Sequence, residues 1–245
     1  MSKSTHDWFK DWANEYDRTL GKIKRHHDML DLAVEMSEVK SGEHILDIGC
    51  GTGLLSLKFL DAAECTIVGV DLSEEKMNIW KNKIHELNLS KQVTVHIGDA
   101  ANLEFEDGVF DIIASTVTLH HIKDKQWAIN KIYNFLSPNG RLIIGDLDVD
   151  TSGSPTDIKR LRHILDYLTE ELALALHDGG VEAFVRMYDN GKKHILNDGE
   201  YCINFEMWSQ LCKNAGFKNI TVTPVKSFNW LKVLCAKKKY NGKDY

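Results

Sequence analysis

Three glycines, Gly49, Gly51 and Gly53, lie in one nine-residue segment, residues 45–53, where an apolar run gives way to a helical pattern over residues 54–60. Glycine permits a tight turn and lets a ligand approach the main chain, and a helix that begins there points free N–H groups outward. The segment therefore predicts a ligand site. A dinucleotide loop would place its third glycine one residue after Gly53, so the spacing argues against a pyrophosphate ligand.

Two aspartates end the next two apolar runs along the chain. Asp71 closes residues 65–72, and Asp99 closes residues 92–99. A carboxylate can accept two hydrogen bonds at once, which suits ligand binding. Asp also favours strand ends and turns on conformational grounds, so a capping role remains the alternative for both residues.

Adjacent histidines occur twice, as His26-His27 and as His120-His121. Histidine titrates near neutrality, and open α/β sheets bind ligands where their strands end, so His120 or His121 is the candidate general base. The alternative is a histidine that contacts the ligand or simply packs. We expect no metal site, because adjacent helical residues point about 100° apart and no third ligand with zinc spacing accompanies either pair.

Five apolar runs must position these residues. They are rich in Ile, Val and Leu and are bounded by Gly, Asp or Asn, as strands are: residues 44–50, 65–72, 92–99, 110–117 and 141–147. Helical patterns alternate with them, which predicts a parallel sheet covered on both faces.

Two of these helices have clear apolar stripes. The first begins after Ser73 as N-cap, with the stripe Met77, Trp80, Ile84 and Leu87. The second carries Trp127, Ile129, Ile132, Tyr133 and Leu136, and the turn at residues 137–140 ends it.

After the fifth run, apolar runs no longer alternate with helical patterns, and we interpret residues 151–203 as a helical insertion. Its long helix, residues 157–177, has a predicted apolar stripe of Ile158, Leu161, Ile164, Leu165, Leu168, Leu172 and Leu176. A last helix then stops at Gly216 with Phe217 beyond it. Residues 219–225 and 230–236 predict a terminal antiparallel hairpin.

Residues 45–53 resemble the signature of class I S-adenosylmethionine-dependent methyltransferases, and further motifs follow in order. These are Asp71, the segment Gly98-Asp99-Ala100, residues 114–122 and the turn within residues 136–142. Residues 114–122 are similar to the fourth motif of the small-molecule branch. The opening Trp8, Trp12 and Tyr16 resemble that branch's N-terminal lid, although their four-residue spacing suits a core stripe equally well.

The resemblance implies a Rossmann-like α/β fold, with a seven-stranded, mostly parallel sheet and a terminal antiparallel hairpin. It implies S-adenosyl-L-methionine as cofactor, with S-adenosyl-L-homocysteine as product. Asp71 would hold both ribose hydroxyls and Asp99 the adenine amino group. The implied cofactor contacts are Asp47, Gly49, Cys50, Gly51, Thr52, Gly53, Asp71, Leu72, Asp99, Ala100 and Thr116, with Trp12 and Tyr16 from the lid. We expect one domain, with a helical lid (1–40), a cofactor-binding core (41–150), the insertion on the acceptor side (151–203) and a terminal helix and hairpin (204–238).

Composition limits the partners and the cellular compartment that we expect for the protein. The 245 residues carry a net charge of -6, which disfavours nucleic acid as a partner. No stretch approaches 18 apolar residues, and the start of the chain is polar, so we expect neither a membrane span nor export. The five cysteines are odd in number and widely spaced, which favours reduced thiols in the cytoplasm.

These observations favour a methyltransferase that acts on a small-molecule acceptor. The amino-methylating motif Asn-Pro-Pro-Tyr is absent, because Ser115, Thr116, Val117 and Thr118 occupy that place. An RNA or protein methyltransferase and a catalytically silent, cofactor-binding regulatory module remain the alternatives. The insertion, with Phe184, Tyr188 and Tyr201, either roofs an acceptor pocket or forms the surface of a homodimer.

Overall fold

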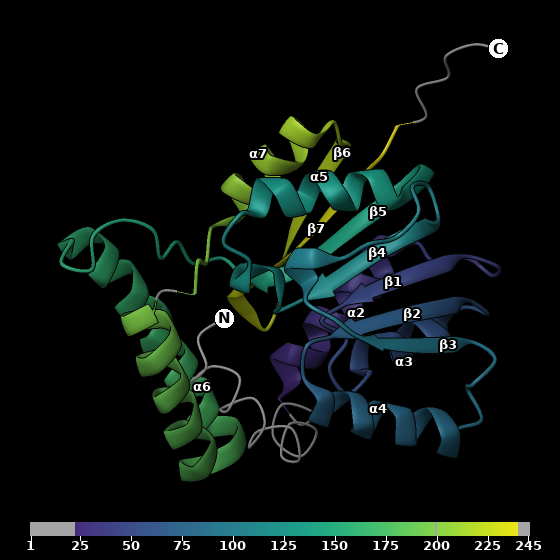
Figure 1. Ribbon diagram of the computed structural model, residues 1–245. Helices are drawn as coiled ribbons and strands as arrows, with labels where there is room; N and C mark the ends of the chain where they lie inside the picture. The colour runs from purple at the N-terminus through teal and green to yellow at the C-terminus, as the bar shows by residue number, and fades with distance from the viewer. Residues whose placement is uncertain (1–22, 199, 240–245) are drawn as a thin grey trace.

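Seven strands form one sheet in the order β3-β2-β1-β4-β5-β7-β6. The computed structural model describes residues 23–198 and 200–239 (Figure 1). The strands are β1 His44–Ile48, β2 Thr66–Asp71, β3 Val93–Ile97, β4 Phe110–Thr116, β5 Leu136–Leu147, β6 Lys218–Val225 and β7 Phe228–Lys237. The first five pair in parallel, and β7 runs antiparallel between β5 and β6. The predicted Rossmann-like sheet with a terminal antiparallel pair is confirmed.

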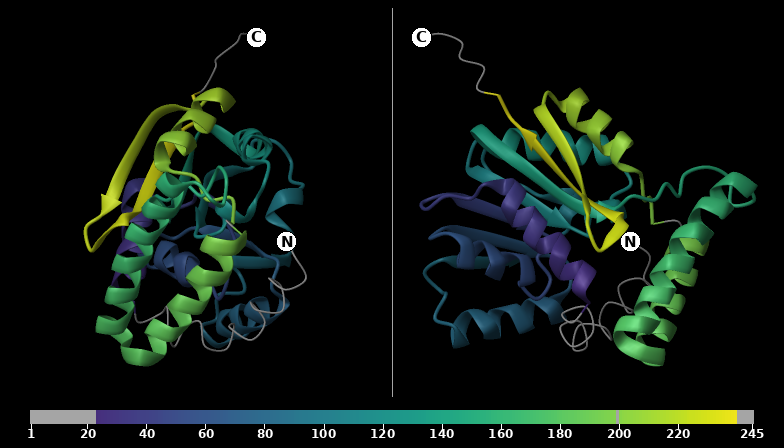
Figure 2. Two further views of the ribbon diagram at one scale, coloured as in Figure 1. Left: turned by 90° about the vertical axis from the view of Figure 1, so that its left-hand side faces the viewer. Right: turned by 180° about the vertical axis from the view of Figure 1, so that it is seen from behind.

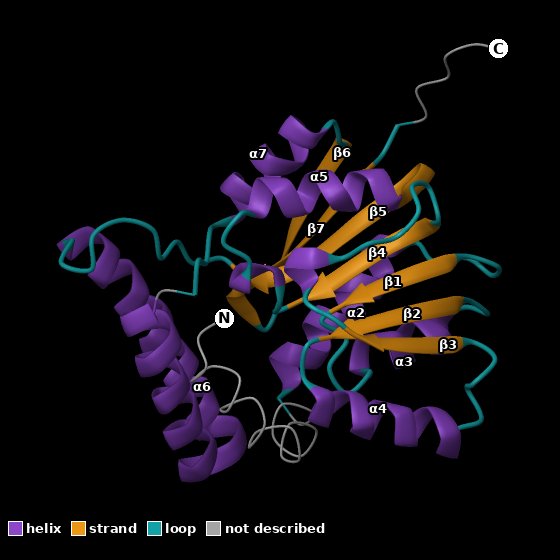
Figure 3. Ribbon diagram, viewed as in Figure 1, coloured by secondary structure: helices purple, strands orange, loops and turns teal. Residues whose placement is uncertain are grey.

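Helices cover both faces of the sheet (Figure 3). On one face, α2 (Lys24–Ser37), α3 (Leu54–Ala62) and α4 (Glu74–Glu86) share a core with strand residues such as Ile45. On the other face, α5 (Lys125–Phe135) and α7 (Phe205–Ala215) pack with residues such as Leu46. Successive strand side chains point to opposite faces, so β1 fills both cores at once.

Local signals account for the ends of the helices. The Ser73 hydroxyl accepts the N–H of Lys76 at the start of α4, as the sequence predicts. Gly216, with φ 103, ends α7, and the N–H of Phe217 returns to the carbonyl of Cys212. The expected position of Leu87 in the apolar stripe is wrong: α4 ends at Glu86, and Leu87 is 54% exposed beyond it.

The turn expected after α5 lies inside β5. Leu136 already pairs with Phe110, and the register then jumps so that Arg141 pairs with Ile112. Residues 137–140 form the irregularity, where Asn139 has φ 66. The strand therefore starts about five residues earlier than its apolar run indicates.

The insertion contains a long broken helix, α6 (Ile158–Asn190), whose buried face differs from the predicted stripe. The buried residues are Ile164, Tyr167, Leu168, Glu171 and Ala175. Ile158, Leu165 and Leu176 are exposed, so placing them in the buried stripe was wrong. A polar residue, Glu171, takes a position on the buried face because Arg25 of α2 lies opposite it at 2.5 Å.

Gly180 divides α6 into two arms. Its backbone, with φ 67 and ψ -162, is not helical. The second arm continues into a π-helix, η4 (Gly191–Asp198), which returns toward the first arm: a Cβ on Gly191 would lie 2.5 Å from the side chain of Leu168. The insertion thus forms two helical arms that lie beside the sheet (Figure 2).

Helix α2 belongs to the core. Met29, Leu30 and Ala33 are at most 1% exposed, and the helix contacts β5, β7 and α3. It is the described part of the segment expected as a lid over residues 1–40. Trp8, Trp12 and Tyr16, the aromatic residues of that expected lid, lie outside the described residues. Within the described ranges, no helix has the length and apolar character needed to cross a membrane.

Candidate active site

A cavity of about 380 Å³ opens at the carboxyl ends of β1, β2 and β4. These ends point toward the side of the molecule where α6 lies (Figure 1). Strands β1 and β4 are neighbours at which the chain order reverses, because β2 and β3 extend the sheet one way and β5 the other. Open α/β sheets bind ligands at such a switch point.

The three glycines of the loop after β1 all have positive φ, but a side chain at each would meet different surroundings. Gly49 (φ 75) faces Thr118, and a Cβ there would lie 2.0 Å from its hydroxyl. Gly53 (φ 87) precedes α3, and a Cβ would lie 2.3 Å from the Trp80 ring. Beside Gly51 (φ 54), a Cβ would meet only Lys76, at 3.9 Å. Gly49 and Gly53 therefore permit packing, whereas Gly51 leaves space open to a ligand.

Asp71, at the end of β2, is connected to the backbone on both sides. One carboxylate oxygen accepts the N–H of Gly51 at 2.9 Å, and the other accepts the N–H of Ser73 at 2.8 Å. Each carboxylate oxygen retains a second lone pair, so the group can still accept from a ligand. The residue thus supports the loop and faces the cavity at once.

Asp99 follows β3 and caps the short helix η2 (Ala100–Asn102) through the N–H of Ala101 at 2.9 Å. Asp99 therefore has the capping role that the sequence left open as an alternative. Asp99 also lines the cavity, together with Ala100. Its exposed carboxylate is available to a ligand as well as to the backbone.

Asp47 is buried beneath the glycine loop and accepts the Ser56 hydroxyl at 2.6 Å. Burial, with a smaller contribution from the charge of Asp71, raises the pKa of Asp47 to about 7, although the Ser56 hydrogen bond opposes the shift. Burial likewise raises the pKa of the Cys50 thiol well above its ordinary value. Cys50 lines the cavity as a neutral thiol.

Helix α2 contributes two residues to the cavity that the sequence did not reveal, His26 and Leu30. Burial lowers the pKa of His26 to about 4, with the charges of His27 and Arg25 adding to the effect. His26 is therefore neutral at pH 7. The only sequence signal was its place in a histidine pair.

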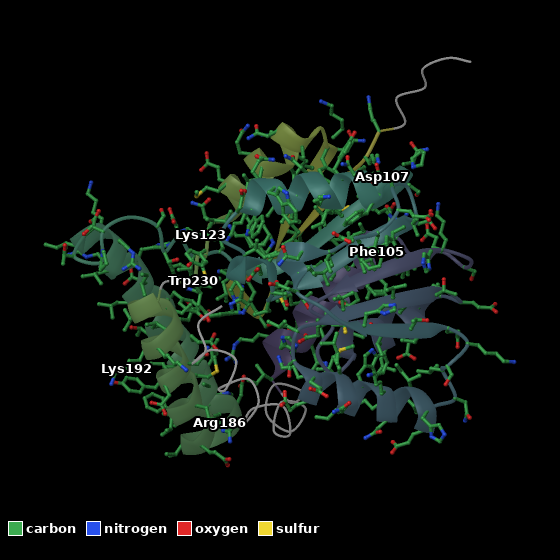
Figure 4. All side chains as sticks on the ribbon, in the orientation of Figure 1. Phe105, Asp107, Lys123, Arg186, Lys192 and Trp230 are labelled. Atoms are coloured by element: carbon green, nitrogen blue, oxygen red, sulfur yellow. The ribbon has the colours of Figure 1, made fainter. Side chains whose placement is uncertain are left out.

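A strained turn follows β4. Val117 has φ 50, which is rare for a β-branched residue, and its N–H donates to the carbonyl of Gly145. The turn leads into η3 (Leu119–His121) and on to Lys123, which lies at the cavity on the side facing α6 (Figure 4). It thereby presents the histidine pair at the sheet's ligand edge.

The two histidines of η3 have different surroundings. His121 lines the cavity. His120 is buried behind it, with Nδ1 2.7 Å from a carboxylate oxygen of Asp146 on β5. Burial by itself lowers the pKa of His120, but the Asp146 carboxylate and, more weakly, Glu200 raise it above the ordinary value overall.

Lys125 lies beside this pair. Its ammonium group donates to the carbonyls of His120 and Ile122 and lies over the ring of Tyr201. Burial lowers its pKa to about 8, although Cys202 and Asp146 oppose the shift. Tyr201 lines the cavity and so brings the insertion to the site.

The fold gathers most of the expected cofactor residues around this one cavity. Its lining includes Asp47, Gly49, Cys50, Gly51, Thr52, Asp71, Leu72, Asp99, Ala100 and Thr116. Of the expected site residues that the structure describes, Gly53 and His120 lie outside that lining. Lining residues absent from the sequence expectation include Lys76, Thr118 and Lys123.

Known proteins resemble this chain in sequence. The chain is 28% identical over 138 residues to 27-O-demethylrifamycin SV methyltransferase of Amycolatopsis mediterranei, a match that covers 56% of the chain and 51% of that relative. It therefore spans about half the length of this relative. It is 24% identical over 235 residues to demethylmenaquinone methyltransferase of Lactobacillus johnsonii, covering 90% of the chain and 87% of that protein.

A solved structure shares the fold. Phosphoethanolamine N-methyltransferase 2 of Haemonchus contortus, in complex with S-adenosyl-L-methionine, has a TM-score of 0.64 at 18% identity, over 95% of this chain and 60% of that one. A family model described as a methyltransferase domain matches residues 39–197. That match includes the glycine loop, both aspartates and the histidine pair. The chain therefore belongs to the methyltransferase domain family.

Proposed function

We propose that this protein transfers a methyl group from S-adenosyl-L-methionine to a small-molecule acceptor by in-line displacement. One observation carries the proposal: a glycine loop, Asp71 and Asp99, at the ends of three neighbouring strands, line a single cavity. The two named relatives support the acceptor class, since their names refer to methylation of a rifamycin and of a menaquinone precursor.

The residues fit an adenosine-containing ligand. The open space over Gly51 admits a ligand against the main chain, and the remaining lone pairs of Asp71 suit a pair of ribose hydroxyls. Asp99 and Ala100 would lie at the adenine end. Bound S-adenosylmethionine supplies an electrophilic methyl group on a sulfonium.

The chain's own residues contribute alignment. Holding the acceptor in line accounts for roughly 7 to 11 kcal/mol of barrier lowering, whereas a general base adds about 10² to 10⁴ in rate and only where the acceptor loses a proton. His121, Lys123 and Tyr201 line the end of the cavity that comes from β4 and the insertion. We assign the acceptor to this end.

The experiment mixes purified protein with S-adenosylmethionine labelled in the methyl group and, separately, with a small-metabolite extract, bulk RNA or a protein extract. We expect label in a small molecule. Label confined to RNA or to protein would refute the acceptor class. Tight binding of S-adenosylhomocysteine without any labelled product would instead favour a silent regulatory module. The Asp71→Ala variant is the negative control for cofactor-dependent labelling.

A further inference from the structure

Three side chains from distant segments converge beside the cavity. His120 and His121 come from η3, and Glu200 comes from the insertion, 79 positions beyond His121. Nε2 of His120 lies 3.6 Å from one Glu200 oxygen, and Nδ1 of His121 lies 3.7 Å from the other. One nitrogen or oxygen atom from each residue falls within 4.8 Å of the others. The expectation of no metal rested on the angle between adjacent helical residues and on the lack of a third ligand. Glu200 supplies a third ligand, and both histidines lie within 4 Å of its carboxylate.

Asp146 orients the first of these ligands. Its hydrogen bond to Nδ1 of His120 leaves Nε2 as the atom that faces Glu200. Metal-binding histidines commonly donate their second N–H to a carboxylate, which fixes the ring and its tautomer. Asp146 is 1% exposed, and its other oxygen has no hydrogen-bond partner within the described part of the chain.

The distances suit an ion better than direct hydrogen bonds. Separations of 3.6 and 3.7 Å are too long for a hydrogen bond between imidazole and carboxylate. Ligands around a tetrahedral zinc, with bonds of about 2.0 to 2.2 Å, lie roughly 3.3 Å apart. Side-chain movements that close the remaining separations, which are at most 4.8 Å, would bring the histidine and glutamate atoms into that geometry.

The charges also favour a cation. The Glu200 side chain is 10% exposed and the Asp146 side chain 1%, so two carboxylates share a nearly dry site. Lys125 brings one ammonium group to the same region, directed to backbone carbonyls. Two carboxylates and one ammonium group therefore lie in this region of the described chain.

We propose that His120, His121 and Glu200 bind one divalent transition-metal ion, with Asp146 holding His120 in position. Two imidazoles and a carboxylate are a donor set that suits zinc, and three protein ligands leave a coordination position open.

The role of the ion rests on the proposed function. His121 and Tyr201, the residue after Glu200, line the cavity, so the open position lies at the acceptor end. A bound ion would hold an oxygen or sulfur atom of the acceptor and lower the pKa of its hydroxyl or thiol. The acceptors expected are therefore molecules with a hydroxyl or thiol at the methylated position, and the histidines act as ligands rather than as a base.

The test measures zinc binding without cofactor or acceptor. Tag-free protein is stripped with a chelator and titrated with Zn²⁺ against a chromophoric zinc indicator. We expect one Zn²⁺ per chain. His120→Ala and Glu200→Gln should weaken binding at least 100-fold, and Asp146→Asn about 10- to 100-fold. His177→Asn, which removes an exposed histidine from α6, is the matched control and should bind as the unaltered protein does.

Co²⁺ titration supplies a second readout. A site built from imidazole and carboxylate gives the visible bands of tetrahedral cobalt without a thiolate charge-transfer band, although five cysteines are present. Binding below one ion per chain in folded protein, equal affinity in Glu200→Gln and His177→Asn, or a thiolate band would each overturn the proposal. Because neither titration needs methyl transfer, loss of the proposed function would leave their results unchanged.

Discussion

The carboxylate of Asp71 accepts the backbone N–H of Gly51 at 2.9 Å, so the acid at the end of β2 holds the glycine loop at the end of β1. The same carboxylate is positioned by the N–H of Ser73 at 2.8 Å, at the start of α4. One side chain therefore both holds the glycine loop in place and carries the carboxylate expected to bind the ribose of the cofactor.

Replacing Asp71 with Ala should weaken S-adenosylhomocysteine binding by about 30-fold or more. The change removes two charge-assisted hydrogen bonds of roughly 1.5 to 3 kcal/mol each, and partial compensation by water still leaves about 2 kcal/mol. Calorimetry on the folded variant measures the loss. Asp61→Ala, an exposed change on α3, should leave the affinity unaltered; equal affinities in the two variants would contradict the assignment of Asp71.

Valine at Gly51 and at Gly53 should produce opposite defects. Gly53→Val places a side chain in the Trp80 ring, so we expect a loss of at least about 1 to 3 kcal/mol in the free energy of unfolding. Gly51→Val faces open space but adds bulk over the ligand's approach and strains a position with φ 54, so it should fold and lose binding. Thermal unfolding and calorimetry, run on both variants, separate the two effects. Intact binding in a folded Gly51→Val protein would refute the cofactor position.

Acid should destabilise the protein through His26. Its pKa is about 4 in the folded state and 6.5 in the reference state, so between these values the unfolded chain binds a proton that the folded protein excludes. This contribution to stability is complete above pH 6.5 and is lost as pH falls toward 4, by about 2 to 3 kcal/mol. Urea unfolding of His26→Gln should show a shallower decline over that window than the unaltered protein. The same decline in both would show that His26 is not responsible, and His27→Gln is the neighbouring control.

The ion pair between Arg25 and Glu171 should couple α2 to α6. Both side chains are nearly buried, and Asp178 provides a second, longer contact to Arg25 at 3.2 Å. Glu171→Gln leaves a buried guanidinium with reduced compensation, so we expect a loss of about 3 kcal/mol in the free energy of unfolding.

The double variant Arg25→Met with Glu171→Leu replaces the pair with apolar groups. It should be more stable than Glu171→Gln alone, because no buried charge is left without its partner. Denaturant unfolding of Arg25→Met, of Glu171→Leu and of the double variant gives the coupling. Additive losses would mean that the pair contributes nothing beyond its separate side chains.

Residue patterns along the chain were enough to predict the sheet, the glycine loop and the two helix ends marked by Ser73 and Gly216. These features depend on short-range physics: short runs of Ile, Val and Leu mark buried strands, Ser73 offers its hydroxyl to the next turn, and Gly216 accepts a left-handed conformation. The acids Asp71 and Asp99 were placed at the ligand edge by the same reasoning, since parallel strands bring their carboxyl ends together.

Long-range contacts set which face of α6 is buried and which residues lie beside the histidines. Helical periodicity ranked Leu165 and Leu176 above Glu171, because no local pattern reports that Arg25 lies across from Glu171. Likewise Glu200 meets His121 only after the insertion folds back through the break at Gly180 and η4. Contacts between residues so far apart depend on the path of the whole chain, which spacing along the sequence does not encode.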